Sequence, residues 1–119
     1  MKKEVQKIAF LDRDGTLIYE PPDTKQVDCL KKLRILPKVI PALQALIERG
    51  YTLVMISNQD GLGTASFPQG AFQTVQKKLL DLFSRRGISF GQIFICPHVE
   101  RDNCGCRKPN IGLLWDFLQ

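Results

Sequence analysis

One stretch near the start of the chain decides the fold: Phe10-Leu11-Asp12-Arg13-Asp14-Gly15-Thr16-Leu17. The apolar residues from Ile8 to Leu11 predict a buried strand, and the carboxylates of Asp12 and Asp14 follow where it ends. Ligands of parallel α/β sheets bind at the carboxyl ends of strands, and alternation along the strand points both carboxylates to one side. We therefore expect them to share one metal ion and one phosphate. For Asp-x-Asp alone, a polar strand end that turns into a loop remains the alternative.

Apolar patterns outward from this stretch predict alternating helices and strands. Helical spacing covers about 38–49 and 69–86, and apolar runs at 51–57 and 92–96 are typical of strands. Pro109 suits the first position of a further helix. Strands that alternate with helices predict an α/β fold with a Rossmann-like parallel sheet. Three strands are few for such a sheet, and we expect the C-terminal part of the fold to be absent.

Residues 16–37 have no long periodic segment, and they include the turn signal Glu20-Pro21-Pro22-Asp23. We expect a flap or hairpin, inserted directly after the first strand, that lies over the carboxylates. Such a flap excludes water and holds substrate specificity. A plain connecting loop is the alternative, although few loops are this long.

Composition narrows the class of protein. At 119 residues, with 44% hydrophobic and 24% charged residues, we expect a single soluble domain over 1–119. The net charge of +5 suits an anionic partner, but the basic residues are scattered, which favours a solvated surface over a nucleic-acid groove. No apolar stretch approaches the roughly 20 residues of a membrane span. The start lacks the apolar core of a signal peptide, so we expect a cytoplasmic protein without a membrane partner.

Three of the four cysteines gather near the end of the chain with its only histidine. Cys96, His98, Cys104 and Cys106 supply three thiolates and one imidazole within a loop of residues 96–106. This set fits a closed, tetrahedral structural zinc site. A disulfide is the alternative, although a bridge between such close cysteines is strained. Cys29 lies in the flap, where we expect a free, partly buried thiol.

A second group of polar residues suits phosphoryl transfer. It comprises the carboxylates of Asp12 and Asp14, the phosphate-binding candidates Ser57 and Asn58 after the second predicted strand, and Lys108. An ionised aspartate attacks phosphorus, and Mg²⁺ on Asp12 and Asp14 offsets its repulsion from the phosphate. Lys108 then stabilises the transferring group, while Asp14 protonates the leaving oxygen and later accepts a proton from water.

Longer motifs, in order along nearly the whole chain, resemble the histidinol-phosphatases of the haloacid-dehalogenase-like superfamily. They are Asp12-Arg-Asp-Gly-Thr-Leu-Ile, Glu20-Pro-Pro, Ser57-Asn-Gln-Asp-Gly-Leu-Gly-Thr, Ser66-Phe-Pro, Ile95-Cys-Pro-His and Cys104-x-Cys-Arg-Lys-Pro. The resemblance implies Asp12 as nucleophile, Asp14 as proton donor with its backbone carbonyl on Mg²⁺, Ser57 and Lys108 on phosphate, and zinc on the four loop ligands.

The resemblance also implies a substrate and a partner domain. The reaction is hydrolysis of histidinol phosphate to histidinol and phosphate in histidine biosynthesis, by a domain that bifunctional relatives fuse to imidazoleglycerol-phosphate dehydratase. Glu20 or Asp23 is expected to meet the substrate ammonium. The superfamily's last acidic motif does not occur before Gln119, so we expect a truncated domain of poor activity. Heptose-bisphosphate phosphatase and a non-catalytic zinc-binding module are the alternatives.

Overall fold

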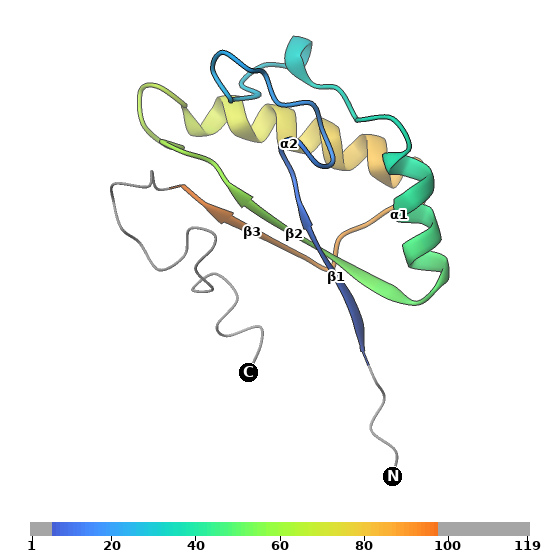
Figure 1. Ribbon diagram of the computed structural model, residues 1–119. Coiled ribbons are helices and arrows are strands. Elements are labelled where there is room, and N and C mark those ends of the chain that lie inside the picture. The colour runs from blue at the N-terminus through green and yellow to red at the C-terminus, as the bar shows by residue number, and fades with distance from the viewer. Residues whose placement is uncertain (1–5, 98–119) are drawn as a thin grey trace.

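The computed structural model describes residues 6–97, which form three strands, two α-helices and one short 3₁₀ helix (Figure 1). The predicted zinc loop beyond Pro97 and the helix expected from Pro109 lie outside these residues. In chain order the elements are β1 (Lys7–Asp12), η1 (Leu30–Lys32), α1 (Val39–Glu48), β2 (Tyr51–Asn58), α2 (Gln69–Ser84) and β3 (Gln92–Cys96).

The three strands form one parallel sheet, as the sequence predicted, and the structure shows their order to be β1-β2-β3. In the register of β1 and β2, Leu11 lies beside Met55 and Asp12 beside Ile56. In the register of β2 and β3, Ser57 lies beside Ile95 and Asn58 beside Cys96. The carboxyl ends of all three strands therefore meet at one edge of the sheet, where the polar residues of the sequence gather.

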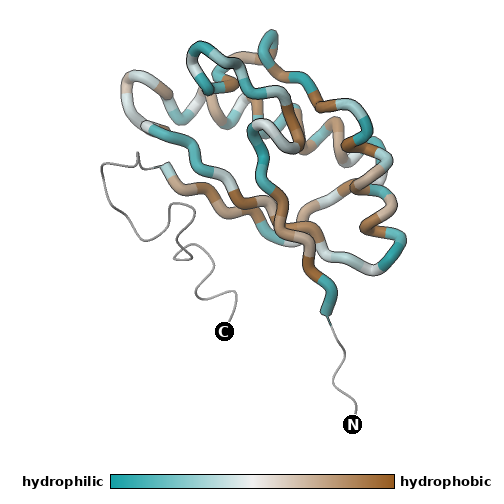
Figure 2. The backbone as a smooth tube through the Cα atoms, viewed as in Figure 1, coloured by the Kyte–Doolittle hydropathy of each residue, from teal (hydrophilic) through white to brown (hydrophobic). Residues whose placement is uncertain are grey.

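The core lies between the sheet and the two helices, which cover the same side of it in Figure 1. Alternate residues of β2, Leu53 and Met55, pack there against apolar residues of α2. Hydrophobic residues follow the strands in Figure 2, whereas the loops at their carboxyl ends are more hydrophilic. The side of α2 that belongs to this core comprises Val75, Leu79 and Phe83, and none of the three is exposed to solvent. Burial of apolar surface against β2 is what holds the carboxyl end of the sheet in place.

Both helix ends follow local backbone chemistry. The helix α1 ends before Gly50, whose φ of +86° lies in the left-handed region that glycine adopts without strain. The helix α2 ends at Ser84, two residues before the predicted end at Arg86. The N–H groups of Arg86 and Gly87 donate to the carbonyls of Phe83 and Ser84 at 2.9 and 3.0 Å. These three-residue spacings tighten the last turn and end the α-helix.

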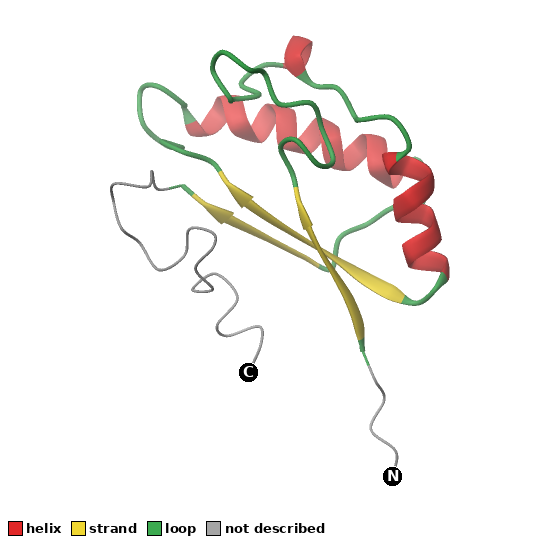
Figure 3. Cartoon of the chain, in the orientation of Figure 1, coloured by secondary structure: helices red, strands yellow, loops and turns green. Residues whose placement is uncertain are grey.

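The segment between β1 and α1, for which the sequence predicted a flap, is built mostly of loop (Figure 3). The N–H of Tyr19 donates to the carbonyl of Arg34 at 2.8 Å, and the N–H of Leu36 donates to that of Leu17 at 3.0 Å. These bonds tie the two arms of the flap together. Leu17 and Val27 are buried in the core cluster, so the base of the flap is part of the core.

Cys29 is free, as expected, but it is exposed rather than partly buried. It immediately precedes η1, a short helix with no buried residue.

Within residues 6–97, no helix combines the length and the apolar character that crossing a membrane requires.

Candidate active site

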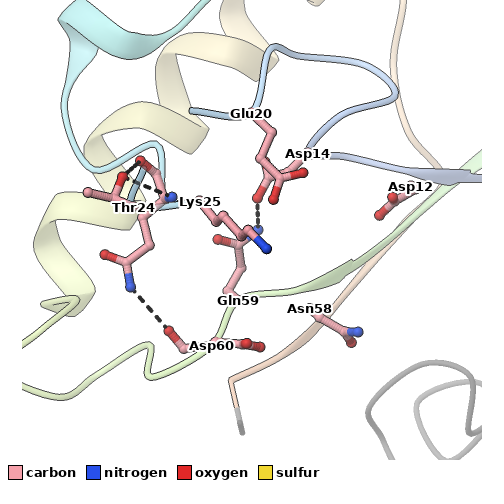
Figure 4. A pocket seen from close by; sticks show the side chains of 9 residues that line it. Asp12, Asp14, Glu20, Thr24, Lys25, Asn58, Gln59 and Asp60 are labelled. Carbon is pink, nitrogen blue, oxygen red and sulfur yellow. Dashed lines mark hydrogen bonds between the residues drawn. The ribbon is translucent and has the colours of Figure 1, made fainter. Parts of the chain in front are cut away.

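The two carboxylates of the opening stretch lie at the carboxyl end of β1. Asp12 is the last residue of the strand, and the chain then turns at Gly15, whose φ is +83°. The carbonyl of Arg13 accepts N–H groups from Leu17 and Ile18 at 2.9 and 3.1 Å, which closes this turn. Asp12 and Asp14 consequently line one cleft of about 430 Å³ (Figure 4). The structure thus brings the two together as the sequence predicted.

Asp12 and Asp14 occupy different environments. Asp12 is exposed, and its Oδ1 accepts the backbone N–H of Arg13 at 3.0 Å. The side chain of Asp14 is only 12% exposed. Burial raises the pKa of the Asp14 carboxyl above its ordinary value, partly opposed by the positive charge of Arg13. An accessible carboxylate next to a buried one whose pKa is raised is an arrangement suited to nucleophile and proton donor.

Both oxygens of Asp14 accept hydrogen bonds from the protein. Nη1 of Arg13 donates to Oδ1 at 2.8 Å, and Nε2 of Gln59 donates to Oδ2 at 2.8 Å. Two donors on opposite oxygens fix the plane of the carboxyl group, so its position does not depend on substrate. The sequence predicted Asp14 but neither of its partners.

Arg13 is fully buried, although it lies between two residues of the cleft. Its guanidinium lies 5.0 Å from the ring centroid of Phe72 on α2, a contact typical of cation–π pairs. Within the described residues, Nε and Nη2 have no hydrogen-bond partner. Burial lowers the pKa of Arg13, and the adjacent Asp14 opposes that effect. The guanidinium therefore supports Asp14 from the core side of the sheet.

The phosphate-binding candidates on β2 occupy two levels. Asn58 lines the cleft, whereas Ser57 is 1% exposed and lies outside the cleft lining. The Ser57 hydroxyl accepts the Nε2 group of Gln59 at 2.6 Å. Lys108 lies outside the described residues. The roles of these three residues remain predictions.

The flap forms the other wall of the cleft, through Glu20, Thr24, Lys25 and Gln26. Nε2 of Gln26 donates to the backbone carbonyl of Asp60 at 3.4 Å, which links the flap to the loop after β2. Asp23, the other acidic candidate of the flap, does not line the cleft. Its Oδ1 instead accepts the N–H of Thr24 at 2.8 Å.

The cleft is predominantly acidic. Its lining includes the side chains of Asp12, Asp14, Glu20 and Asp60, and Lys25 is the one basic residue among the described lining residues. Within residues 6–97, no hydrogen bond or ion pair engages the charged groups of Glu20 or Lys25. A ligand with both a positive and a negative group is complementary to such a wall.

Of the four predicted zinc ligands, the structure describes Cys96 alone. Its side chain is buried at the end of β3, while His98, Cys104 and Cys106 lie beyond Pro97. Between residues 6 and 97, no three histidine, cysteine or acidic side chains are grouped to hold a metal ion. Zinc therefore remains a prediction.

Three residues that line the cleft were not predicted from the sequence as site residues: Gln59, Lys25 and Asp60. The position of Gln59, two residues after Ser57 in a polar strand end, was a usable signal, because alternation points both side chains the same way. Lys25 has φ of 56° in a flap without periodicity, and nothing in the sequence marks it.

Comparisons with known proteins show that this chain is similar to phosphatases. The model of the family described as polynucleotide kinase 3 phosphatase matches residues 7–119. The histidine biosynthesis bifunctional protein HisB of Legionella pneumophila (strain Lens) is 52% identical over 115 residues, or 97% of this chain. HisB of Campylobacter jejuni subsp. doylei is 51% identical over 114 residues, or 96% of the chain. In both comparisons the chain spans 32% of the relative's length.

A solved structure is similar as well. The D,D-heptose 1,7-bisphosphate phosphatase from B. bronchiseptica, complexed with magnesium and phosphate, superposes with a TM-score of 0.83 at 29% identity. The match covers 94% of this chain and 62% of that one. With the family match over residues 7–119, the parallel sheet and the paired aspartates at the end of β1, it follows that the chain belongs to the polynucleotide kinase 3 phosphatase family of haloacid-dehalogenase-like phosphatases.

Proposed function

We propose that this chain hydrolyses histidinol phosphate with Mg²⁺, through a phosphorylated Asp12. The observation that carries the proposal is the pair of aspartates in one cleft, one exposed and one buried between two hydrogen-bond donors. An exposed carboxylate at a strand end is accessible to an incoming phosphate. A buried carboxyl with a raised pKa is suited to deliver a proton.

The reaction takes two steps on these residues. An oxygen of Asp12 attacks phosphorus, the bond between phosphorus and the ester oxygen breaks, and Asp14 protonates the departing alkoxide. Asp14 then accepts a proton from water, whose oxygen attacks the phosphorus of phospho-Asp12 and releases phosphate. The covalent intermediate divides one difficult displacement into two easier ones, and Asp14 is already in place to assist both.

The oxygen-rich cleft fits Mg²⁺, which binds proteins through one or two carboxylates and completes its shell with water and substrate oxygens. Asp12 and the backbone carbonyl of Asp14 would hold the ion. When bound, Mg²⁺ neutralises the repulsion between carboxylate and phosphate. Ser57, Asn58 and Lys108 are the proposed contacts to the other phosphate oxygens.

Two observations favour histidinol phosphate as the substrate. The relatives with about half of their matched residues identical are histidine biosynthesis proteins. The acidic wall of the cleft is also complementary to the amine and imidazole of that substrate. The likeness to a heptose-bisphosphate phosphatase supplies the competing substrate, which is an uncharged sugar beyond its phosphates.

The test is phosphate release from histidinol phosphate and from D,D-heptose 1,7-bisphosphate, with and without Mg²⁺. We expect Mg²⁺-dependent release, with the higher kcat/KM for histidinol phosphate. Calorimetric binding of each ester in Mg²⁺ gives a second readout that needs no turnover. Preference for the heptose ester in both measurements would reassign the substrate, and no Mg²⁺-dependent binding or release of either would contradict the proposal.

Glu20 is expected to contact the substrate ammonium. The variant Glu20→Gln should raise KM for histidinol phosphate about 10- to 100-fold, because a hydrogen bond to a charged group contributes about 1.5–3 kcal/mol. KM for p-nitrophenyl phosphate, which has no ammonium, should stay unchanged. The matched control is Asp23→Asn, a second flap carboxylate that is exposed and lies outside the cleft. Equal increases for both substrates would show that Glu20 supports the flap rather than the ammonium.

A further inference from the structure

Gln59 occupies a rigid position between two strands. It follows the last residue of β2 and is 2% exposed. Its backbone N–H donates to the carbonyl of Cys96 at 2.8 Å, and the next turn is tied to β3 by the N–H of Gly61, which donates to the carbonyl of Pro97 at 2.9 Å. A buried side chain on a backbone fixed in this way has little rotational freedom.

The side-chain amide of Gln59 bridges two functional groups. Nε2 lies 2.8 Å from Oδ2 of Asp14 and 2.6 Å from Oγ of Ser57. The NH₂ of the amide faces both groups, and the lone pairs of a carboxyl oxygen accept a hydrogen bond whether or not the group carries a proton. That NH₂ has two hydrogens, one for each partner. Gln59 therefore joins a residue that follows β1 to a residue within β2.

The bridge has a consequence for each partner. The second oxygen of Asp14, Oδ1, accepts a hydrogen bond from Nη1 of Arg13 at 2.8 Å, so the carboxyl group is held on both sides. The Ser57 hydroxyl accepts from Gln59, which leaves its own hydrogen available for donation to another acceptor. A hydroxyl oriented in this way is prepared to donate to a phosphate oxygen.

We propose that Gln59 is a positioning residue that aims the proton of Asp14 at the leaving oxygen and the hydroxyl of Ser57 at the phosphate. The inference rests on the proposed phosphatase function and deepens it. If it holds, loss of the Gln59 amide harms proton delivery and phosphate contact together. Proton delivery matters most for a poor leaving group, whereas phosphate contact matters equally for every ester.

The experiment compares kcat/KM of Gln59→Met for two esters, because this parameter reports the steps up to departure of the leaving group. For histidinol phosphate, an alkyl ester, we expect a loss of about 100-fold, as for misplaced catalytic groups. For p-nitrophenyl phosphate, whose leaving group needs little protonation, we expect a loss of about 10-fold. The ratio of the two values should thus change about 10-fold from wild type.

The chain offers a matched control. Gln76 on α2 is a second buried glutamine, 9% exposed, whose Nε2 lies 3.5 Å from Sδ of Met55. The variant Gln76→Met removes a buried amide from the core without touching either aspartate, and the ratio of the two esters should stay at the wild-type value. If a thermal unfolding curve shows that Gln59→Met is not folded, Gln59→Asn replaces it. Asparagine keeps an amide on a side chain too short to reach both partners, and the same change in ratio is expected.

Equal losses for both esters in the Gln59 variant would overturn the inference and leave Gln59 a structural residue. Failure of the proposed function gives a different result, since wild type would then release no phosphate from either ester in excess of its Asp12→Asn variant.

Discussion

Replacing Asp12 by asparagine is expected to lower phosphate release on the order of 10³-fold or more, as loss of a covalent nucleophile does. The amide has nearly the shape of the carboxylate but lacks its negative oxygen. Its Oδ1 still accepts the backbone N–H of Arg13, and the residue is exposed. The thermal unfolding temperature should therefore stay close to that of wild type. Steady-state phosphate release and a thermal unfolding curve measure both effects.

The covalent step gives this prediction an independent readout. Rapid acid quench of wild type during turnover should trap a protein heavier by one phosphoryl group, and Asp12→Asn should show no such species in the mass spectrum. The matched control is Asp81→Asn on α2, an exposed carboxylate paired with Arg85, which should keep full activity. A phosphorylated protein that persists in Asp12→Asn would place the nucleophile elsewhere.

The strands and the paired aspartates were predictable because their signals are local. The apolar run of β2 is long enough to require burial, and its residues Leu53 to Ile56 are at most 8% exposed. The bounds of β3 match the prediction residue for residue. That Asp12 and Asp14 lie in one cleft followed from their spacing, because a strand end and a two-residue period place them together.

The flap was only partly predictable. Its position after β1 could be inferred from missing periodicity, but its anchoring depends on contacts between its two arms. The backbone bonds from Tyr19 to Arg34 and from Leu36 to Leu17 join residues far apart in sequence. Val27 is completely buried although its neighbours in sequence are polar, and no repeat in the sequence marks it as a core residue.

The supporting residues of the site were not predictable for a related reason. An arginine beside a strand end is expected to be solvated. Arg13 is instead buried, where it forms an ion pair with Asp14 and lies over the ring of Phe72. The bridge from Gln59 to Asp14 exists only because β1 and β2 are neighbours with their carboxyl ends aligned. Partners of this kind follow from the sheet and not from any single stretch of sequence.

The buried pair of Arg13 and Asp14 leads to the largest expected effect on stability. The variant Arg13→Met keeps most of the side-chain volume but removes the charge, and it leaves Asp14 largely buried without its ion-pair partner. Breaking a buried pair in this way lowers the free energy of unfolding by about 3 kcal/mol. Urea denaturation measures the change. The control is Lys32→Met, which breaks the partly exposed pair with Asp28 and should leave the free energy of unfolding nearly unchanged, because solvent screens such pairs.

A second substitution separates the charge from the packing. Adding Asp14→Asn to Arg13→Met removes the unpaired carboxylate, and the double variant should recover more than half of the lost stability. Replacing both members of a buried pair is often neutral, because the folded protein no longer bears the desolvation of two charges. Arg13 bears that penalty with its Nε and Nη2 groups unpartnered among the described residues, so the pair itself contributes little net stability. A double variant no more stable than Arg13→Met would instead show that the guanidinium stabilises the fold through its contact with Phe72, and that the charge of Asp14 is incidental.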